Sequence, residues 1–143
     1  MILPDLNLLI YAYNEAAPHH KRARAWWEDQ LSKPQPVGIP WAVGFGFIRL
    51  TTHPRVLVTP LAPSTALNYV RAWFDCPSVT PLDPGPRHLA IVSQLFQATG
   101  VAGRLTTDTH LAALAIEHQY ELNSNDMDFA RFPGLRWTNP LKD

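Results

Sequence analysis

The chain has 143 residues, of which 46% are hydrophobic, so a packed core is expected and a disordered chain is excluded. Its 12 Lys and Arg residues balance its 12 Asp and Glu residues, and this formal net charge of +0 excludes a chain-wide attraction to nucleic acid. Any RNA or DNA contact must therefore come from a local patch, a metal ion or a second subunit. Cys76 is the single cysteine, which excludes an internal disulfide framework and a thiolate metal site.

The absence of a basic leader followed by an apolar run predicts no secretion signal, and no apolar stretch approaches the length that spans a membrane. We therefore expect a cytoplasmic protein with no membrane partner. A lone cysteine fits the reducing conditions of that compartment. The length predicts one domain covering residues 1–143.

Short apolar runs alternate along the chain with longer segments of helical periodicity. Strands are expected, in chain order, at Ile2–Leu3, Val37–Ile39, Val79–Pro81, Tyr120–Leu122 and Leu135–Thr138. Helices are expected at Leu6–Tyr13, from Pro18 through Leu31, and at Pro40–Leu50, Pro63–Phe74, Arg87–Ala98 and Asp108–His118. This alternation predicts an α/β fold of three layers, in which a central parallel sheet is covered by helices on both faces.

Two of these helices carry specific predictions about the core. The segment Pro40–Leu50 is apolar on nearly all sides, which predicts a buried helix. In the helix Pro63–Phe74, the expected core residues are Leu67, Val70, Ala72 and Trp73.

Aspartates stand where apolar segments begin or end. Asp5 follows the first expected strand, Asp126 and Asp128 follow the fourth, and Asp108 opens an Ala/Leu-rich helix. In open α/β sheets, ligands bind outside the carboxyl ends of the strands, so Asp5 and Asp126 are expected on the functional edge. Clustered carboxylates repel one another unless a hard cation neutralises them, which favours Mg²⁺ or Mn²⁺ and metal-assisted phosphodiester chemistry.

Each aspartate also has a purely structural interpretation. Asp5 is a preferred N-cap type, Asp108 follows two threonines that are also cap types, and Asn125–Asp126 is a turn-type pair. We favour a ligand role for Asp5, with Asn7 as the side chain that orients it by hydrogen bonding. For Asp108 the ligand role is favoured only in combination with the other acids. Asp128 reaches the same ion as Asp126 only if the loop between them curls.

Other polar and aromatic residues are weighed against packing roles. His110 is expected to be a packed or surface residue, because no partner stands at metal-site spacing. The five tryptophans favour core and interface packing over base stacking. Arg49 lies on the apolar helix, where a cation needs a partner, and it is expected to pair with the acids, to face substrate phosphate or to form a buried salt bridge.

Four stretches carry a family resemblance. They are Pro4–Ala12 (PDLNLLIYA), Phe47–Thr52 (FIRLTT), Asp108–Ala115 (DTHLAALA) and Asp126–Leu135 (DMDFARFPGL). In this order they resemble PIN-domain ribonucleases of the VapC toxin type, from bacterial toxin–antitoxin pairs, nearly from end to end. The resemblance implies a PIN-like three-layer domain.

The resemblance also implies an Mg²⁺- or Mn²⁺-dependent endoribonuclease. Asp5, Asp108 and Asp126 would be the catalytic metal ligands, Asp128 a further ligand, and a metal-activated water would attack the phosphodiester in line. Gly46 stands where the family usually carries a Glu, which implies weaker metal affinity or fewer bound ions. The family further implies a VapB-type antitoxin as partner, and a homodimer or a heterotetramer or octamer with that antitoxin.

Three rival functions have their own discriminating features. A haloacid-dehalogenase-like phosphotransferase needs a second Asp at the position of Asn7 and a downstream Lys, and no Lys lies between Lys33 and Lys142. A structure-specific DNA nuclease of related fold would carry more acids and basic segments that grip DNA. A catalytically weak or inactive PIN-like binding module remains the main alternative, with Gly46 as its sign.

Overall fold

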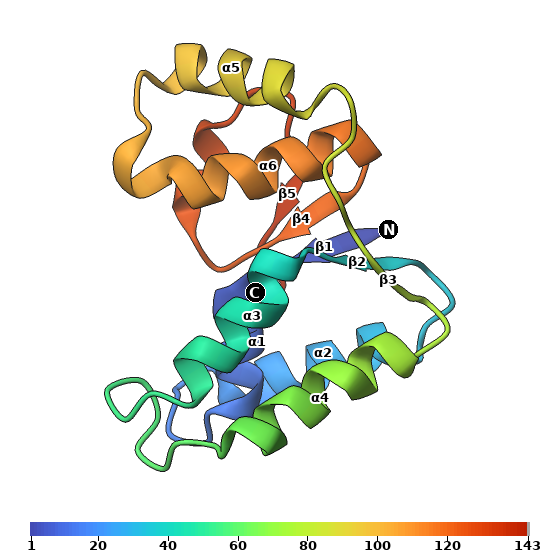
Figure 1. The fold of residues 1–143 in the computed structure, drawn as a ribbon, viewed down its shortest axis with the longest axis vertical. Helices are drawn as coiled ribbons and strands as arrows, with labels where there is room; N and C mark the ends of the chain where they lie inside the picture. The colour runs from blue at the N-terminus through green and yellow to red at the C-terminus, as the bar shows by residue number, and fades with distance from the viewer. Residues whose placement is uncertain (143) are drawn as a thin grey trace.

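A computed structural model describes residues 1–142 as a five-stranded parallel sheet between helices (Figure 1). The strands are β1 (Ile2–Pro4), β2 (Val37–Ile39), β3 (Val79–Pro81), β4 (Glu121–Asn123) and β5 (Trp137–Thr138). The helices are α1 (Leu6–Tyr13), α2 (His20–Ser32), α3 (Trp41–Thr51), α4 (Pro63–Asp75), α5 (His88–Thr99) and α6 (Thr106–His118), with short 3₁₀ turns η1 (Gly103–Leu105) and η2 (Met127–Arg131). The expected α/β fold of three layers is confirmed.

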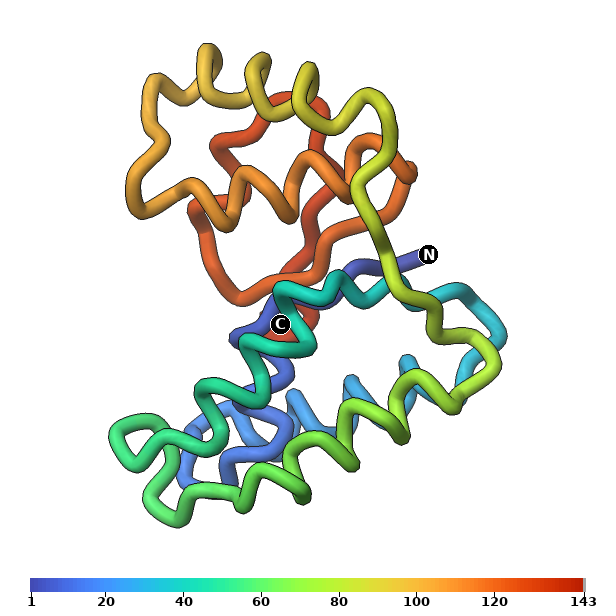
Figure 2. Tube along the Cα trace, viewed as in Figure 1, coloured from blue at the N-terminus to red at the C-terminus, as the bar shows by residue number. Residues whose placement is uncertain are grey.

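The order of strands across the sheet is β3-β2-β1-β4-β5, and all neighbours run parallel. The chain builds outward from β1 to β3, then crosses to the other side of β1 to add β4 and β5. Figure 2 shows this crossing, where the segment after β3 runs over the sheet to α5. The order therefore reverses between β1 and β4, and crevices at such switch points are where open α/β sheets bind ligands.

Helices cover both faces of the sheet because the crossovers from β1 to β2, from β2 to β3 and from β3 to β4 each carry two α-helices. Helices α1 to α4 lie on one side and α5 with α6 on the other (Figure 1). The extended backbone at Pro40 and Ala62 starts α3 and α4, and Pro63 occupies the first turn of α4, where its missing N–H costs nothing.

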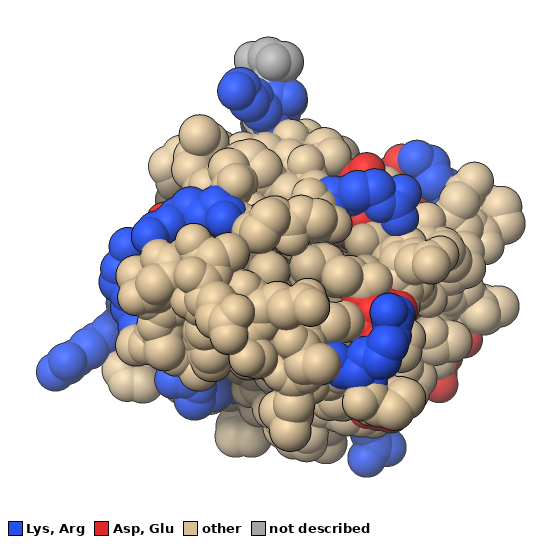
Figure 3. Space-filling model, turned by 90° about the horizontal axis from the view of Figure 1, so that it is seen from above, with Lys and Arg blue, Asp and Glu red and all other residues tan. Residues whose placement is uncertain are grey.

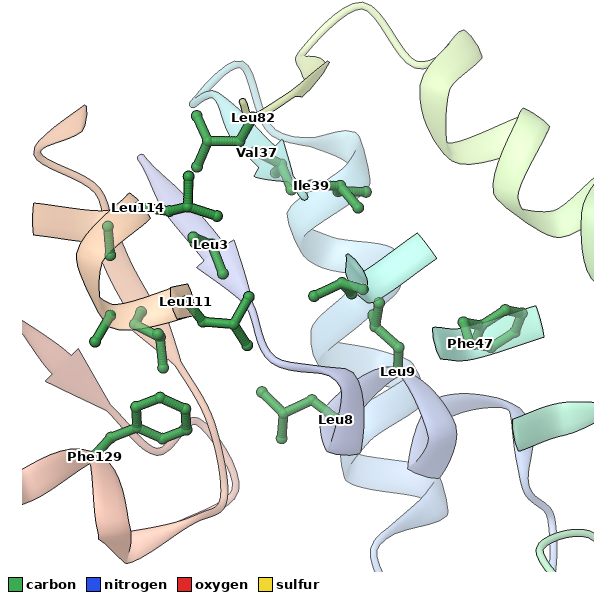
Figure 4. Close-up of a cluster of buried hydrophobic side chains, with 14 of the residues drawn as sticks. Leu3, Leu8, Leu9, Val37, Ile39, Phe47, Leu82, Leu111, Leu114 and Phe129 are labelled. Atoms are coloured by element: carbon green, nitrogen blue, oxygen red, sulfur yellow. The ribbon is translucent and has the colours of Figure 1, made fainter. Parts of the chain in front are cut away.

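The core lies on both faces of the central strands. Leu3 of β1 sits between Leu111 and Leu114 of α6 on one face and Leu8 and Leu9 of α1 toward the other (Figure 4). A second part of the core joins the helices of the α1–α4 layer through the aromatic side chains Trp27, Phe47 and Trp73. Burial of this kind stabilises by about 25 cal/mol per Å² of apolar surface removed from water.

The structure corrects several predictions about helix faces. Helix α3 is not buried on all sides, because Trp41 is 46% and Phe45 63% exposed. In α4, Leu67 and Ala72 are exposed, and the residue that packs inward with Val70 and Trp73 is Ala66. The misassignment arose because Leu67 is the larger apolar side chain, whereas the buried face of α4 runs through Ala66, Val70 and Trp73.

Charged side chains are dispersed over the surface. Figure 3 shows a face on which Lys and Arg are scattered, several beside Asp or Glu, rather than gathered into one basic patch. Pairs on α2, such as Arg24–Glu28 at 2.9 Å and Lys33–Asp29 at 2.7 Å, are exposed. Such surface pairs contribute little stability each. Within residues 1–142, no helix has both the length and the apolar character needed to cross a bilayer.

Candidate functional site

Asp5 stands at the carboxyl end of β1, at the point where the chain turns into α1. Its carboxylate accepts hydrogen bonds from the backbone N–H of Leu6 at 2.8 Å and from the hydroxyl of Ser124 at 2.6 Å. The N-cap interpretation is thus correct, yet it does not explain why the side chain is only 8% exposed. Burial raises the pKa of this carboxyl above its ordinary value, and the charge of Asp126 adds to that effect, while the two hydrogen bonds oppose it.

Asp126 and Asp128 follow β4, the strand next to β1. The pairing of Pro4 with Asn123 aligns the ends of the two strands, so that the segment after β4 meets Asp5. Asp126 caps η2 by accepting a hydrogen bond from the backbone N–H of Asp128 at 2.9 Å. The 3₁₀ turn therefore supplies the curl that brings the two carboxylates to the same side, which the sequence left as a condition.

Asp108 lies inside the first turn of α6, because the helix begins two residues earlier, at Thr106. The N-cap position is Leu105, which makes no side-chain cap hydrogen bond, so the capping interpretation of Asp108 is wrong. Burial, followed by the charges of Asp5, Asp126 and Asp128, raises the pKa of Asp108 to about 6, although Arg104 opposes the shift. A carboxyl poised in this way gains from a cation that replaces its proton.

Three carboxylates converge at the switch point. One oxygen from each of Asp108, Asp126 and Asp128 lies within 4.8 Å of the other two, and all three residues are half-buried. Asp5 lies beside this group and raises the pKa of Asp108. The donors are oxygens only, which suits hard divalent cations such as Mg²⁺ or Mn²⁺. The donor set therefore fits the metal that the resemblance implies.

Ser124 connects the acids, and the sequence-based reasoning missed it. Its side chain is fully buried, donates to Asp5 and accepts from the backbone N–H of Asp126 at 3.0 Å. The amide of Asn7 donates to the same hydroxyl at 3.4 Å. We expected Asn7 to orient Asp5 directly, whereas it acts on Asp5 through Ser124. The only signal in the sequence was the position of Ser124, directly after a strand and two residues before Asp126.

Arginines flank the cluster on one side. Arg104 contacts the Asp128 carboxylate at 2.9 Å, and Arg131 approaches it at 3.9 Å. Arg49 is different, because its side chain is exposed on α3 and has no ion-pair partner among residues 1–142. The predictions that Arg49 is buried and that it pairs with the acids are therefore wrong, since exposure to water removes the need for a partner.

Gly46 packs directly against Leu6, the residue that follows Asp5. A Cβ atom built at position 46 would lie 2.7 Å from Cδ2 of Leu6, closer than real Cβ contacts come. The Leu6 side chain therefore occupies the space that a longer residue at position 46 would enter. Leu6, the residue next to Asp5, thus fills the space that a Glu at position 46 would need.

His110 packs against another histidine rather than taking part in the acidic cluster. Its Nδ1 lies 2.9 Å from Nε2 of His88, and the two rings meet edge to face. This confirms the prediction of a packed residue. Trp27 and Trp73 are likewise buried, in line with the packing role expected of the tryptophans, although Trp41 is exposed.

The parallel sheet, the strand order and the acids at the switch point together define an α/β nuclease-like architecture. The chain belongs to the PIN-domain family, whose model matches residues 2–135. Along its full length it is similar to Ribonuclease VapC33 of Mycobacterium tuberculosis, with 47% identity over 143 residues and complete coverage, 100%, of both chains. The resemblance stated from the sequence is thereby confirmed.

Solved structures with lower sequence identity share the fold. A toxin–antitoxin complex from Klebsiella pneumoniae contains a chain with a TM-score of 0.64 at 17% identity, and the match covers 98% of both chains. VapC20 of Mycobacterium tuberculosis, described as a sarcin-ricin loop cleaving toxin, matches with a TM-score of 0.61 at 17% identity and covers 95% of this chain and 99% of its own. At this level of identity the likeness concerns the fold alone.

Proposed function

We propose that this chain is an endoribonuclease toxin of a toxin–antitoxin pair, acting as one PIN domain over residues 1–143. The observation that carries the proposal is the convergence of Asp108, Asp126 and Asp128, beside the buried Asp5, at the switch point of the sheet. Full-length similarity to a protein named as a ribonuclease supports the reaction class. Acid clusters of this composition hold divalent ions in phosphodiester hydrolysis.

The acids have distinct proposed roles. Asp5, Asp108 and Asp126 are proposed as the catalytic ligands of Mg²⁺ or Mn²⁺, with Asp128 as a further ligand that Arg104 holds in place. A bound ion supplies Lewis-acid activation of water and neutralises charge at the phosphate. Burial of Asp5 keeps water from competing at its carboxylate, and Ser124 fixes the orientation of that carboxylate.

Substrate contacts are proposed from the positions of the cations. The exposed guanidinium of Arg49 is available for a bidentate contact with RNA phosphate. The guanidinium of Arg131 lies 3.9 Å from the Asp128 carboxylate. Once a metal ion binds that carboxylate, Arg131 is proposed to contact the RNA phosphate instead. Because the net charge is zero, these local contacts rather than a global field are proposed to hold the RNA.

A VapB-type antitoxin is proposed as the partner, because structures named as VapBC and as toxin–antitoxin complexes share this fold over nearly the whole chain. Dimerisation of the toxin, or a heterotetramer or octamer with the antitoxin, is proposed on the same basis. The exposed aromatic side chains Trp41 and Phe45 on α3 offer apolar surface for such assembly.

The test is cleavage of total cellular RNA by the purified, antitoxin-free chain with Mg²⁺, with Mn²⁺ and with EDTA. We expect discrete fragments with either metal and none with EDTA. Asp126→Asn should lower cleavage by more than about a hundredfold, because loss of a ligand costs more than loss of a residue that supports one. Mn²⁺ binding measured by calorimetry should fall in parallel.

The matched control is Asp75→Asn, the same change at an exposed aspartate at the end of α4. It should leave both cleavage and Mn²⁺ binding unchanged. If folded wild-type protein cleaves no RNA with any metal, the ribonuclease proposal fails. In that case Gly46 and Leu6 would point to the alternative, a PIN-like module that binds without cutting.

A further inference from the structure

The carboxylate of Asp128 faces an arginine at each of its two oxygens. Nη1 of Arg104 lies 2.9 Å from Oδ2, and Nη1 of Arg131 lies 3.9 Å from Oδ1. Within residues 1–142, Asp128 is the only acid of the cluster that forms an ion pair. The contact that holds Asp128 in place therefore distinguishes this residue from the other three acids.

The same carboxylate is also part of the proposed metal site. One of its oxygens lies within 4.8 Å of oxygens from Asp108 and Asp126. Because a guanidinium faces each oxygen of Asp128, an ion that binds there must approach a positive charge. Two cations repel each other, so the ion and the closer guanidinium, that of Arg104, compete for one carboxylate.

The contact between Arg104 and Asp128 is one that an ion can replace. The Arg104 side chain is 67% exposed and that of Asp128 30%, so water screens the pair. Exposed ion pairs of this kind contribute little stability. A divalent ion gains from several carboxylates at once, whereas this guanidinium donates to one. An ion held by the whole cluster therefore displaces the arginine.

Arg104 stays beside the cluster after it is displaced. It lies in η1, which leads directly into α6, and it precedes Asp108 by four residues. Among residues 1–142, its guanidinium donates a hydrogen bond to Asp128 alone. The side chain is thus free to turn into solvent when an ion binds and to return when the ion leaves.

We infer that Arg104 neutralises Asp128 in the metal-free chain as a tethered cation, and that a divalent ion must displace it in order to bind. This inference rests on the metal site proposed above and deepens it by naming what regulates its filling. Arg104 is a positioning residue, because it acts on the ion through Asp128. It sets the metal concentration at which the site fills, and hence the concentration at which RNA is cut.

The inference predicts effects of opposite sign in the two states of the site. Without metal, Arg104 offsets repulsion among the acids, and its charge opposes the rise in the pKa of Asp108. With metal, the same charge competes with the ion. Removing it should therefore weaken the metal-free fold and tighten metal binding. If Arg104 only oriented Asp128 as a ligand, its removal would weaken metal binding instead.

The test is calorimetric titration of Arg104→Gln with Mn²⁺ at about pH 8, where the acids of the cluster are ionised. We expect the affinity for Mn²⁺ to rise about two- to fivefold, the range set by the loss of one exposed ion pair. In EDTA the variant should melt up to about 4 °C lower than wild type. The increase in melting temperature on adding Mn²⁺ should be larger than in wild type.

Two further variants serve as controls. Arg104→Lys keeps a cation within reach of Asp128 and should bind Mn²⁺ nearly as wild type does. Arg71→Gln removes the same charge from an exposed position on α4 and should leave Mn²⁺ binding unchanged. In RNA cleavage, the Mn²⁺ concentration that gives half of the maximal rate should fall for Arg104→Gln and for neither control.

The outcomes separate this inference from the proposed function. Unchanged or weaker Mn²⁺ binding by Arg104→Gln would overturn the inference and leave the metal site and the ribonuclease in place. A loss of melting temperature that is equal with and without Mn²⁺ would also overturn it, because the contact would then be purely structural. Tighter Mn²⁺ binding would support it even if the wild type cut no RNA. A wild type that binds no Mn²⁺ would refute the metal site and this inference with it.

Discussion

Ser124 illustrates at the residue scale how a neutral side chain can organise several charged ones. Its hydroxyl donates to Asp5, and it accepts from the backbone N–H of Asp126 and from the amide of Asn7. The contacts with Asp5 and Asn7 join the segment after β4 to the segment after β1, and the contact with Asp126 lies within the segment after β4. This residue therefore sets the relative position of two acids that come from different strands.

Replacing Ser124 by Ala should lower Mn²⁺ affinity by about 10- to 100-fold, the range for residues that support metal ligands. The hydrogen bond from Ser124 opposes the upward shift of the Asp5 pKa, so its loss should raise that pKa further. The affinity lost should be partly regained at higher pH, where Asp5 is ionised again. Calorimetric titrations with Mn²⁺ across a pH series measure both effects.

Ser64→Ala, at an exposed serine in the first turn of α4, is the matched control for this change. A Ser124→Ala variant whose affinity loss is the same at every pH would argue for a purely structural role of the hydroxyl.

Asp108 has a consequence for folding as well as for binding. Its pKa is about 6 in the folded chain and near the ordinary value of 3.8 when unfolded, so its ionisation destabilises the metal-free fold. The cost is absent below the unfolded value, grows as pH rises, and is complete above about 6. Asp108→Asn removes it, so the metal-free variant should melt higher than wild type at about pH 8.

This gain in melting temperature should shrink as the pH falls through 6 and vanish below about 4, as thermal melts in EDTA would show. Asp75→Asn serves again as the control and should show no such trend. A gain that is independent of pH would mean that the carboxyl of Asp108 titrates normally.

At the element scale, helix α3 carries two glycines that face different helices, Gly44 toward α4 and Gly46 toward α1. A Cβ at Gly44 would lie 3.7 Å from Cγ1 of Val70, an ordinary contact, whereas a Cβ at Gly46 would lie 2.7 Å from Cδ2 of Leu6. Alanine is a better helix former than glycine by about 1 kcal/mol. The two positions should therefore respond differently to the same substitution.

Gly44→Ala should raise the free energy of unfolding by up to about 1 kcal/mol, while Gly46→Ala should gain less or lose stability because Leu6 must move. In a Leu6→Ala background, Gly46→Ala should recover the full gain. Urea unfolding of the wild type, Gly46→Ala, Leu6→Ala and the double variant forms a double-mutant cycle that isolates the contact. Equal gains at both glycines, with no coupling to Leu6, would contradict this account of the packing.

The elements themselves were largely predictable because their signals are local. The bounds of α1, β2 and β3 agree with the sequence-based expectation, since prolines, alternating apolar runs and polar turns mark them. The start of α6 was placed two residues late, because Thr106, Thr107 and Asp108 are all cap-type residues, whereas η1 runs directly into the helix and Leu105 takes the N-cap position. The short turn η2 was not predicted.

At the scale of the whole molecule, the sheet order β3-β2-β1-β4-β5 brings together residues that are more than a hundred positions apart. Asp5 and Ser124 meet because β1 and β4 are neighbours with Pro4 paired to Asn123. The same reversal of strand order forms the switch point of the sheet, and the first turn of α6 places Asp108 there. The tertiary structure buries the carboxyls of Asp5 and Asp108 close to other acids, so burial first, and then repulsion from these acids, raises their pKa values.

Sequence alone determined the class of fold, the family and the acids expected at one edge, because apolar periodicity and the ends of strands are written in neighbouring residues. Only the tertiary structure decided which face of α4 is buried, that Arg49 is exposed, that Ser124 joins the acids and that Leu6 fills the space beside Gly46. These features depend on contacts between segments distant in the chain, and no local pattern encodes the distance between two such side chains.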